Sequence, residues 1–598
     1  MCLSSNSNKV MVIPVARLKF SRRLTALIEM VFSAKDAERL VRTVLHLWQK
    51  KSFPALPAKR LPPESQSFLD SRHVCSFADW LSEQPFNEAA YWLASTYATL
   101  VGEEIRTNRA LFFTPPALAE RVIDHLIDQG ASLLSQHWHD PACGGAAFLV
   151  PIAQRMIGAM AAAGIPVREQ ISRLEKNLSG NDLDPVLLDL SRSFLSMAAY
   201  SLICSSGIQP NFTLSQGDGL LDYVGHKFSP DIIAINPPYR KLKSGEVSNY
   251  RDRHGDVIEG QPNIYGLFIN RALQLPRPGG LIGLLTPTSF LSGRSFSKLR
   301  TKLLSLSDVL HLDMLSDRTS MFINVEQEIA ITILRRHNSA SPDGAMTRVS
   351  VLDSKGKFSD IGDYSLPSSG KPWPVPRSVS AASLVRVGEF IKFRLKDYGY
   401  IARIGHLVAY RDERKRFENR PAETTGKLYL PLVWATDINK DGCFEPGRPS
   451  KYHRIERYVE IDANCRGIVS KQSVLLQRLT SSDQNRRLVA AAVPDKFLLE
   501  QGGFICENHV IVLETGKNNP WTPQLLAELL NSKCVDQVFR SISGSSNVSI
   551  SELNELPLPD PKRLLARISK SNNMEISVQS AYSADKRARL REKAESQG

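Results

Sequence analysis

The sequence predicts an α/β fold for the middle of the chain, with an open, mainly parallel sheet and helices on both of its faces. Residues 231–235 form a short, β-branched apolar run that ends in a proline-rich turn, as a buried strand does at its carboxyl end. Upstream, the small-residue loop 140–149 leads into an apolar, helix-like stretch at 150–163. The interval between the two motifs has room for two or three strand–helix units, and such alternation is typical of a parallel sheet.

The turn itself indicates a binding chemistry. Its residues are Asn236, Pro237, Pro238 and Tyr239, and they lie at the sheet edge where open α/β folds bind their ligands. The Asn236 side-chain oxygen and the Pro237 carbonyl can both accept hydrogen bonds from an exocyclic amino group. The two prolines fix φ and remove competing donors, and the tyrosine ring offers a stacking face. The alternative for the turn taken alone is a proline-rich strand exit with a surface tyrosine.

Acidic residues follow three successive predicted strands. Asp140 opens the small-residue loop, which is not a phosphate loop because no Gly-Lys-Ser/Thr follows. Asp182 comes one strand–helix unit later, where a carboxylate can accept both hydroxyls of a ribose. Asp218 lies in the turn 216–219 and is suited to accept from a purine amino group. Each acid alone could cap a helix or lie in a solvated turn, but their order on successive strands favours a ligand site.

Taken together, these motifs resemble those of S-adenosylmethionine-dependent N6-adenine DNA methyltransferases, the methylase half of restriction-modification systems. The resemblance covers 105–340 with several ordered motifs and, more loosely, the C-terminal third. Residues 111–119 resemble the opening motif of the family, which places Thr114 and Pro115 beside the methionine end of the cofactor. Residues 262–268 and 278–287 look like the later helix and strand of the same domain, and Phe322 matches an aromatic that sandwiches the extruded base.

The resemblance implies a Rossmann-like, S-adenosylmethionine-dependent methyltransferase domain. The catalytic residues that it implies are Asn236, Pro237, Pro238, Tyr239 and Phe322. The cofactor-binding residues that it implies are Thr114, Pro115, Asp140, Pro141, Ala142, Cys143, Gly144, Asp182, Asp218 and Asn236, and no metal is expected. The Asn side chain and the first proline carbonyl would accept the two hydrogens of a flipped adenine N6 amino group, while the two aromatic rings would stack on the base.

Two positions depart from the family pattern. Ala146 stands where the family usually has the second glycine of its cofactor loop, and its methyl group is tolerated if φ is negative there. The segment before the loop, 136–139, is less apolar than a buried parallel strand normally is.

Composition and charge agree with a nucleic-acid partner. The chain has 598 residues, too many for one core, and its 75 Lys and Arg against 61 Asp and Glu give a net charge of +14. This balance suits a polyanion, here double-stranded DNA, and salt-sensitive binding. The eight cysteines are scattered without metal-site spacing, and we find neither a bilayer-spanning apolar run nor a signal peptide. We therefore expect a cytoplasmic, nucleoid-associated bacterial enzyme with no membrane partner.

The chain divides into five segments by pattern. They are an N-terminal helical subdomain (1–104), the catalytic domain (105–340), a linker (341–385), an α+β target-recognition domain (386–568) and a basic tail (569–598). Helical periodicity in the first segment favours a packing element over a DNA clamp. The linker contains one possible strand at 348–352, and the tail is expected to be a frayed basic helix or a disordered arm.

The C-terminal domain supplies the candidate DNA contacts. Residues 474–480, 508–513 and 547–559 resemble segments of target-recognition domains. The basic candidates within the domain are Lys471, Arg478, Arg486 and Arg487. For each of them a solvated basic face is the alternative, and charge alone does not separate base contacts from phosphate contacts.

Three functions remain open at this stage. The first is a site-specific DNA adenine methyltransferase, with a separate restriction endonuclease as a partner, since we find no convincing nuclease core in the sequence. The second is a methyltransferase for another nitrogen, in RNA or protein glutamine, although the large C-terminal domain argues against it. The third is a degenerate methyltransferase fold that serves as a scaffold or specificity subunit of a defence complex.

Overall fold

The computed structural model describes two compact units. The first comprises Met1–Phe290 with Ser295–Lys371, and the second Leu291–Arg294 with Pro372–Gly598. The structure describes residues 14–595 except for 58–59, 222–228, 316–327, 339–345, 354–355, 369, 389–390, 423–426, 449–455, 463, 481–483 and 544–546. Phe322 and its predicted role therefore lie outside the described residues.

The first unit is built on a nine-stranded sheet with the order β3-β2-β1-β4-β5-β7-β6-β8-β9. Its strands are β1 (Trp138–Asp140), β2 (Leu178–Asp182), β3 (Thr213–Gln216), β4 (Ile232–Ile235), β5 (Leu281–Pro287), β6 (Ser307–Leu315), β7 (Ile329–Arg336), β8 (Thr347–Leu352) and β9 (Phe358–Tyr364). The five strands β3, β2, β1, β4 and β5 are parallel to one another. β7 pairs antiparallel with both β5 and β6. The predicted α/β fold with a largely parallel sheet is confirmed.

The chain reverses its direction of growth at the centre of this sheet. From β1 it proceeds outward to β2 and β3, and then returns to place β4 and β5 on the other side of β1. The crevice outside the carboxyl ends of β1 and β4 is thus a topological switch point, where open α/β sheets bind ligands.

The polar first strand is stabilised by its neighbour. His137 and His139 both place a ring nitrogen on the hydroxyl of Ser179 in β2, at 2.7 and 2.8 Å. The imidazoles are buried, and a shared hydroxyl partner lets a polar segment form an interior strand.

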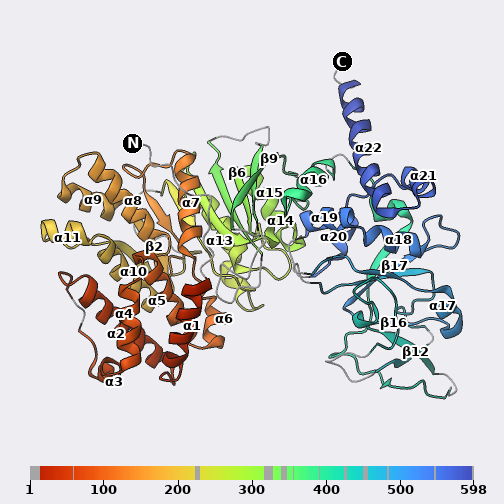
Figure 1. Cartoon of the computed structure of the whole chain (residues 1–598), viewed down its shortest axis with the longest axis horizontal. Helices are drawn as coiled ribbons and strands as arrows, with labels where there is room; N and C mark the ends of the chain where they lie inside the picture. Colours follow the sequence, from red (N-terminus) through yellow and green to blue (C-terminus); the bar gives the residue numbers. More distant parts are fainter. Residues whose placement is uncertain are drawn as a thin grey trace. The chain divides into compact units, whose positions relative to one another are not determined.

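Helices cover both faces of the sheet (Figure 1). The helices between residues 116 and 306 are α7 (Pro116–Asp128), α8 (Leu149–Ala162), α9 (Val167–Asn177), α10 (Pro185–Ala198), α11 (Tyr200–Ser206), α12 (Arg251–His254), α13 (Ile264–Gln274), α14 (Ser289–Ser292) and α15 (Ser297–Leu306). The start of α10 is fixed by sequence, because Pro185 occupies its first turn and the Asp184 side chain accepts from the backbone N–H groups of Val186 and Leu187.

A buried ion-pair network ties α7 to the sheet. The Asp313 carboxylate of β6 accepts from Arg121 and, at 2.8 Å each, from His125 and His311. Burial alone would raise the pKa of Asp313, but the bonds from the two histidines hold it well below its usual range. The Arg121 guanidinium also lies 3.5 Å from the ring centre of Phe358 in β9. The ligand atoms of Asp313 and the histidines lie within 4.8 Å of one another, but the arginine on the same carboxylate makes this an ion-pair network.

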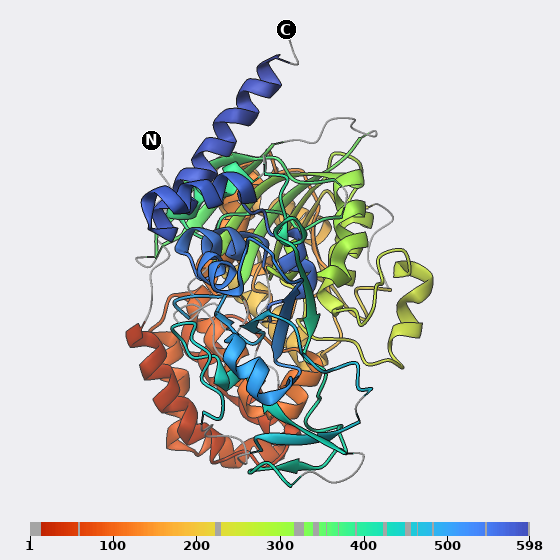
Figure 2. The same cartoon turned by 90° about the vertical axis from the view of Figure 1, so that its right-hand side faces the viewer.

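The N-terminal helices form a cluster that packs on the catalytic domain. They are α1 (Pro14–Ile28), α2 (Ala34–Ser52), α3 (Gln66–Leu69), α4 (Arg72–Ser82), α5 (Phe86–Leu100) and α6 (Glu103–Arg109), and Figures 1 and 2 show them grouped together in red and orange. Trp48 of α2 lies 6.0 Å from Phe194 of α10, and Arg42 pairs with Asp189 at 2.5 Å. The contacts of α2 with α10 support the packing interpretation of this segment.

Part of the predicted linker belongs to the sheet. Residues 347–364 form β8 and β9, with β8 parallel to β6 and β9 antiparallel to β8. The assignment of 341–385 to a linker was therefore wrong for these residues, and only one of the two strands was expected. Val349 and Val351 are buried against the sheet, a contact that the Ser-, Pro- and Gly-rich flanks do not indicate.

The second unit has an α+β architecture. One sheet has the order β10-β17-β14-β15 and the other β11-β13-β12-β16. The strands are β10 (Tyr400–Ile404), β11 (Arg416–Phe417), β12 (Leu428–Val433), β13 (Tyr458–Ile461), β14 (Ser473–Gln477), β15 (Ala490–Ala492), β16 (Ile505–Cys506) and β17 (Val510–Thr515). The helices are α16 (Ala382–Gly388), α17 (Asp495–Gln501), α18 (Pro523–Leu530), α19 (Lys533–Ile542), α20 (Ile550–Glu555), α21 (Pro561–Ser571) and α22 (Met574–Glu595). Leu476 and Ile511 of the first sheet join the helical core, while Leu475 and Val512 join a second core on the other face.

The predicted tail begins inside this unit. Val578 and Tyr582 of α22 are fully buried in the helical core, and the Tyr582 hydroxyl donates to the carbonyl of Pro557 at 2.8 Å. The expectation of a frayed or disordered arm from residue 569 onward is corrected for this stretch, because two apolar side chains one turn apart anchor it.

Six short 3₁₀ turns complete the described elements, at Pro63–Ser65, Val247–Tyr250, Arg294–Phe296, Val379–Ala381, Leu395–Tyr398 and Ala435–Asp437. Among the described residues no single helix is both long and apolar enough to cross a membrane. The pair α10 and α11, bent by 63°, reaches that length and composition only when the two are taken together.

Candidate active site

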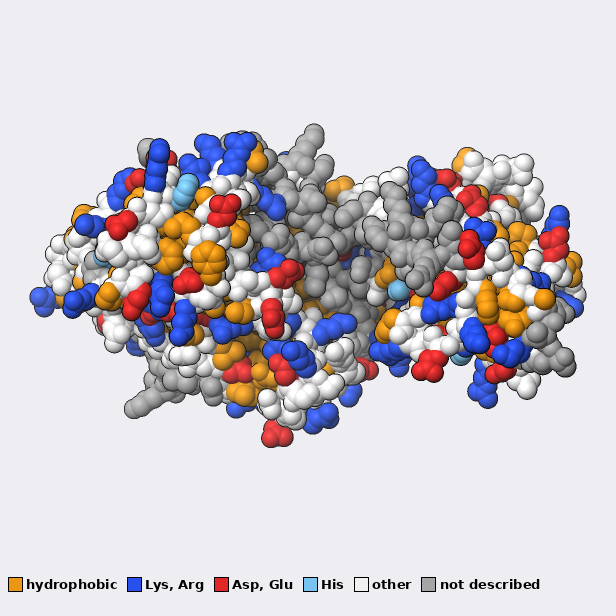
Figure 3. Space-filling model, turned by 90° about the horizontal axis from the view of Figure 1, so that it is seen from below, with side chains coloured by type: hydrophobic (Ala, Val, Ile, Leu, Met, Phe, Trp, Pro, Cys, Tyr) orange, Lys and Arg blue, Asp and Glu red, His pale blue; other side chains and the backbone are white. Residues whose placement is uncertain are grey.

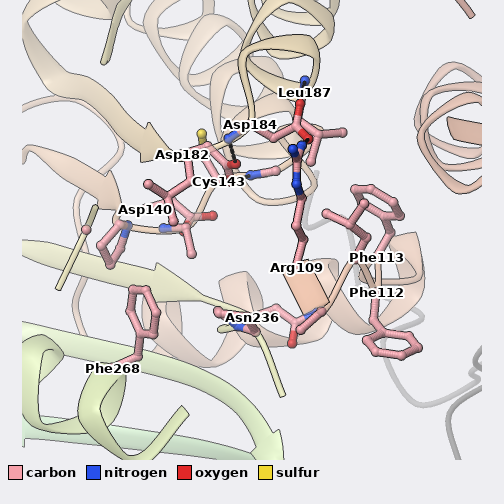
Figure 4. Close-up of a pocket in the computed structure, with 18 of the residues that line it drawn as sticks. Arg109, Phe112, Phe113, Asp140, Cys143, Asp182, Asp184, Leu187, Asn236 and Phe268 are labelled. Atoms are coloured by element: carbon pink, nitrogen blue, oxygen red, sulfur yellow. Dashed lines mark hydrogen bonds and ion pairs between the residues drawn. The ribbon is translucent and has the colours of Figure 1, made fainter. Parts of the chain in front are cut away.

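A cavity of about 400 Å³ lies in the first unit, at the carboxyl ends of β1 to β4 (Figure 4). Of the predicted site residues, Thr114, Asp140, Pro141, Ala142, Cys143, Gly144, Asp182, Asp218, Asn236 and Pro238 line it. Pro115, Pro237 and Tyr239 are not part of its lining. The lining also includes residues that were not among the predicted site residues, among them Arg109 and Leu187, and Phe112, Phe113, Ile264 and Phe268 from the 111–119 and 262–268 motifs.

The loop after β1 is held against β2 by its backbone. Cys143 N–H donates to Asn181 O at 2.9 Å, and Gly144 N–H donates to the Asp182 carboxylate at 2.8 Å. Gly144 has a φ of +49°, a conformation that suits glycine. The Asp140 carboxylate accepts from Ala142 N–H at 3.0 Å, and its burial raises its pKa well above the usual range.

Ala146 adopts a left-handed conformation in this loop. Its φ is +58°, and the residue is completely buried. The condition under which its methyl group was expected to be harmless, a negative φ, is therefore not met. A left-handed alanine costs about 1 kcal/mol or more relative to an unstrained backbone, so the loop stores strain at the position where the family usually has glycine.

The far side of the cavity carries a pair of acids. Burial raises the pKa of Asp182 to about 6, although backbone N–H groups of Asp184 and Gly144 donate to its carboxylate. Asp184 accepts from Arg109 at 2.6 Å and from the Tyr97 hydroxyl at 3.2 Å. Figure 4 shows the Arg109 side chain extending across the cavity toward this carboxylate. The only sequence signal for Arg109 was its place just ahead of the 111–119 motif.

Asp218 faces the cavity from the loop after β3. Its two oxygens accept from the Leu220 N–H at 2.9 Å and from the Tyr250 hydroxyl at 2.8 Å. The next residue, Gly219, approaches the loop after β1 so closely that a Cβ atom would lie 1.9 Å from the carbonyl oxygen of Pro141. Only glycine permits this approach, which brings the acids of two loops to one cavity.

Asn236 is fixed at both ends of its amide. Its Nδ2 donates to Thr114 Oγ1 at 2.9 Å, and its Oδ1 accepts from the Tyr239 hydroxyl. That hydroxyl also lies 2.8 Å from the carbonyl of Leu285 in β5. Thr114 therefore contacts the amide at the end of β4 and also lines the cavity, and the cofactor contact predicted for it stays a prediction.

Tyr239 does not present a free stacking face in this structure. Its side chain is buried, its ring meets that of Tyr265 edge-on at 6.1 Å, and burial raises its pKa well above the usual range. The ring is buried here, so its stacking on a flipped base stays a prediction. The Tyr239 hydroxyl contacts Asn236 within the turn and the Leu285 carbonyl in β5, and these contacts hold the ring inward.

The four basic candidates of the second unit occupy different environments. Lys471 is exposed just before β14, and Arg478 is half-buried just after it. Arg486 is also half-buried and donates to the Asn531 carbonyl at 3.4 Å. Arg487 is a correction, because it is 2% exposed and its guanidinium bonds to the Thr480 carbonyl and the Ser543 hydroxyl inside the domain. An arginine committed to interior acceptors does not contact DNA.

The residues of the cavity fit S-adenosylmethionine. Its volume lies in the range of small-molecule sites. It offers carboxylates for a ribose and for an amino group, apolar walls such as Leu187 and Phe268 for a purine ring, and a strained small-residue loop that lets the backbone approach.

Comparisons with known proteins agree with this geometry. Residues 211–322, which include Asp218 and the Asn-Pro-Pro-Tyr turn, match the Eco57I restriction-modification methylase family. The chain is 23% identical to the Type II methyltransferase M.BsuBI of Bacillus subtilis over 62% of this chain and 71% of that protein. It is 24% identical to M.PstI of Providencia stuartii, over 58% and 68% of the two chains.

A solved structure supports the fold. The Type IIL restriction-modification enzyme MmeI, solved in complex with DNA, superposes with a TM-score of 0.57 at 14% identity, over 93% of this chain and 89% of that one. The chain is therefore a methyltransferase with a Rossmann-like catalytic domain that uses S-adenosylmethionine, and it is related to the Type II enzymes of restriction-modification systems.

Proposed function

We propose that the chain is a site-specific DNA methyltransferase that methylates the N6 amino group of an adenine flipped out of the duplex, as the modification enzyme of a restriction-modification system. The observation that carries the proposal is the fixed amide of Asn236, held by Thr114 and Tyr239 beside a cavity that fits the cofactor. An amide at the carboxyl end of a buried strand can accept from an exocyclic amino group.

In this proposal, different residues bind the cofactor and the target base. Asp182 would accept from the ribose hydroxyls, Asp218 from the adenine amino group of the cofactor, and the loop 140–144 would contact its methionine part. When bound, S-adenosylmethionine supplies an electrophilic methyl group. No dedicated base is required of the protein, because the amino nitrogen becomes acidic once it is alkylated.

The protein's contribution to the rate is mainly positioning. Asn236 Oδ1 retains a second lone pair while it accepts from Tyr239, so it can also accept one hydrogen of the target amino group. The Pro237 carbonyl would accept the other, which directs the nitrogen lone pair toward the methyl group. We propose that Phe322 stacks on the base and that Tyr239 acts chiefly through Asn236. Flipping costs a few kcal/mol, which these contacts offset.

A map of N6-methyladenine in a methylation-free bacterial host tests the proposal. Cells that express the wild-type chain are compared with cells that express Asn236→Ala, and both proteins are checked for solubility. Methylated adenines confined to one sequence motif and absent from the variant are expected. Equal methylation in both strains would refute the role of Asn236.

The scaffold alternative has one structural argument in its favour, the strained Ala146 in the cofactor loop. Binding of S-adenosylmethionine to the purified chain separates the two functions. A scaffold would show neither methylation nor cofactor binding. Binding without any adenine methylation would point to a missing partner subunit, or to a nitrogen of RNA or protein glutamine as the substrate.

A further inference from the structure

Charge alone does not locate the surface that reads the DNA sequence. Figure 3 shows Lys and Arg side chains mixed with Asp and Glu on the face that it draws. Charges of both signs are interspersed on that face, and the net charge of +14 of the whole chain suits general binding to a polyanion. Sequence-specific contacts require fixed donors, acceptors and apolar groups at one place.

The topology of the second unit brings three loops together at one end of the strands of the β10-β17-β14-β15 sheet. β10 and β14 end there, at Ile404 and Gln477, and β17 begins there, at Val510. The register confirms the alignment, since Ile404 pairs with Ile511 and Gln477 pairs with Val510. We call the residues that follow or precede these three strand ends the reading edge: 405–407, 478–479 and 507–509.

Lys471 lies at the opposite end of the same sheet. It precedes β14, whose first residue Ser473 pairs with Glu514 near the end of β17. Because the five-residue strand is about 17 Å long and both residues lie beyond its ends, Lys471 and Arg478 are separated by more than that distance along β14. A duplex that contacts the reading edge with its bases therefore has no need of Lys471 for base recognition.

Arg478 is held rigidly at the reading edge. Its N–H donates to the His509 carbonyl at 2.8 Å, and its own carbonyl accepts from Val548 N–H at 2.8 Å. The guanidinium Nη1 donates to the Asn508 carbonyl at 3.0 Å. The side chain is half-buried, so its remaining N–H donors are presented in a restricted geometry.

His509 is oriented by a buried carboxylate. Glu507, with a side chain only 3% exposed, accepts from His509 N–H at 2.9 Å and lies 2.6 Å from its Nδ1. An Nδ1–H bonded to this carboxylate makes Nε2 an acceptor in the neutral ring. The imidazole is 43% exposed, and the neighbouring Leu479 is 48% exposed. The edge thus offers a fork of donors, one fixed acceptor and an exposed apolar group.

We propose that the reading edge contacts base edges in the major groove of DNA, with Arg478 and His509 as the residues that determine sequence specificity. This inference rests on the proposed function. The chemistry matches that of base edges: a guanidinium binds guanine O6 and N7, an imidazole acceptor binds an exocyclic amino group, and an exposed aliphatic side chain contacts a thymine methyl.

Arg478→Lys, His509→Ala and Lys471→Ala test the proposal in the full chain. The first keeps the charge and removes the planar fork, the second removes the oriented acceptor, and the third is the matched control at the opposite edge. For each protein we would map methylated adenines in the methylation-free host. We would also measure the ratio of affinities for a duplex with the motif and one without it.

Arg478→Lys and His509→Ala should each lower the affinity ratio about ten- to hundredfold and admit other bases at one position of the motif. Lys471→Ala should leave the ratio and the motif unchanged, even if it weakens binding to both duplexes equally. An unchanged ratio and motif in both test variants would overturn the inference. If the proposed function itself failed, the wild-type chain would methylate no motif, an outcome distinct from methylation that the variants leave unaltered.

Discussion

The substitution Thr114→Val isolates the contact that fixes Asn236. Valine has nearly the same shape as threonine but lacks Oγ1, which accepts from Asn236 Nδ2 at 2.9 Å. Thr114 is only 3% exposed, so water has little access to replace the lost acceptor. The variant therefore leaves the amide with its Tyr239 contact and frees its other end.

The expected effect follows from the value of one hydrogen bond. A net contribution of about 0.5–1.5 kcal/mol for a neutral bond corresponds to roughly a two- to tenfold loss of correctly oriented amide. Misplacement of the acceptor in the transition state adds to this loss, and a shift of about 1 Å can cost up to about a hundredfold. We predict a decrease of kcat by about tenfold, with the KM for S-adenosylmethionine changed by less than about twofold.

Single-turnover methylation of a duplex that contains the motif measures this effect. Thr114→Ser keeps the hydroxyl and should retain most of the rate, while Tyr239→Phe removes the bond at the other end of the amide and should also slow methyl transfer. The reasoning would be refuted if Thr114→Val transferred methyl groups at the wild-type rate. A raised KM for the cofactor with unchanged kcat would instead support the cofactor contact predicted for Thr114 from the sequence.

Four further changes test other parts of the structure. Ala146→Gly should raise the free energy of unfolding by about 0.5–1 kcal/mol in urea titrations, since it relieves a left-handed alanine; a decrease would contradict the strain. The pKa of about 6 at Asp182 predicts that cofactor affinity falls as the pH drops through 6, because the protonated carboxyl accepts fewer hydrogen bonds. Calorimetric titration with the cofactor at several pH values checks this. If an Asp182→Asn variant kept the same pH dependence, Asp182 would not be its cause. Arg487→Met should destabilise the chain by about 2–3 kcal/mol by leaving buried acceptors unpaired, whereas Arg486→Ala should stay within about 0.5 kcal/mol; equal effects would mean that burial does not separate them. Asp313→Asn should lower the free energy of unfolding by about 3 kcal/mol near neutral pH. Because the pKa of Asp313 is lower in the folded protein than in the unfolded chain, the difference in stability between wild type and variant should shrink below about pH 4. A difference in stability that is constant with pH would refute the ion-pair role.

The parts of the site that depend on local chemistry could be predicted from the sequence. The β-branched run before Asn236 forms a buried parallel strand, and prolines fix the turn that follows whatever the tertiary contacts are. Asp140, Asp182 and Asp218 converge because parallel strands end at the same sheet edge, so their order along the chain was sufficient to bring them to one cavity.

The parts that depend on distant contacts could not be predicted. The inward position of Tyr239 is set by Leu285 and Tyr265, which come from another strand and a helix. The buried Arg487 side chain donates to Ser543, which is distant in sequence. The sequence Arg486-Arg487 does not indicate which of the two side chains is buried. In the same way, His509 gains its role only from a buried carboxylate at Glu507, which composition and periodicity do not distinguish from a surface acid.

The unfavourable features of the first unit concentrate around one cavity. The cofactor loop contains a left-handed alanine, and the two carboxyl groups nearest to it, Asp140 and Asp182, have pKa values raised by burial. Strain and desolvated acids lower the stability of the free protein, and such features occur mainly at functional sites, where a ligand compensates for them. A ligand that donates hydroxyl and amino hydrogens to these acids would offset the cost, which is what a nucleoside-containing cofactor can do. The strained Ala146 alone is compatible with a scaffold, but a scaffold that binds no cofactor gives no account of the two buried acids, which therefore favour a working methyltransferase.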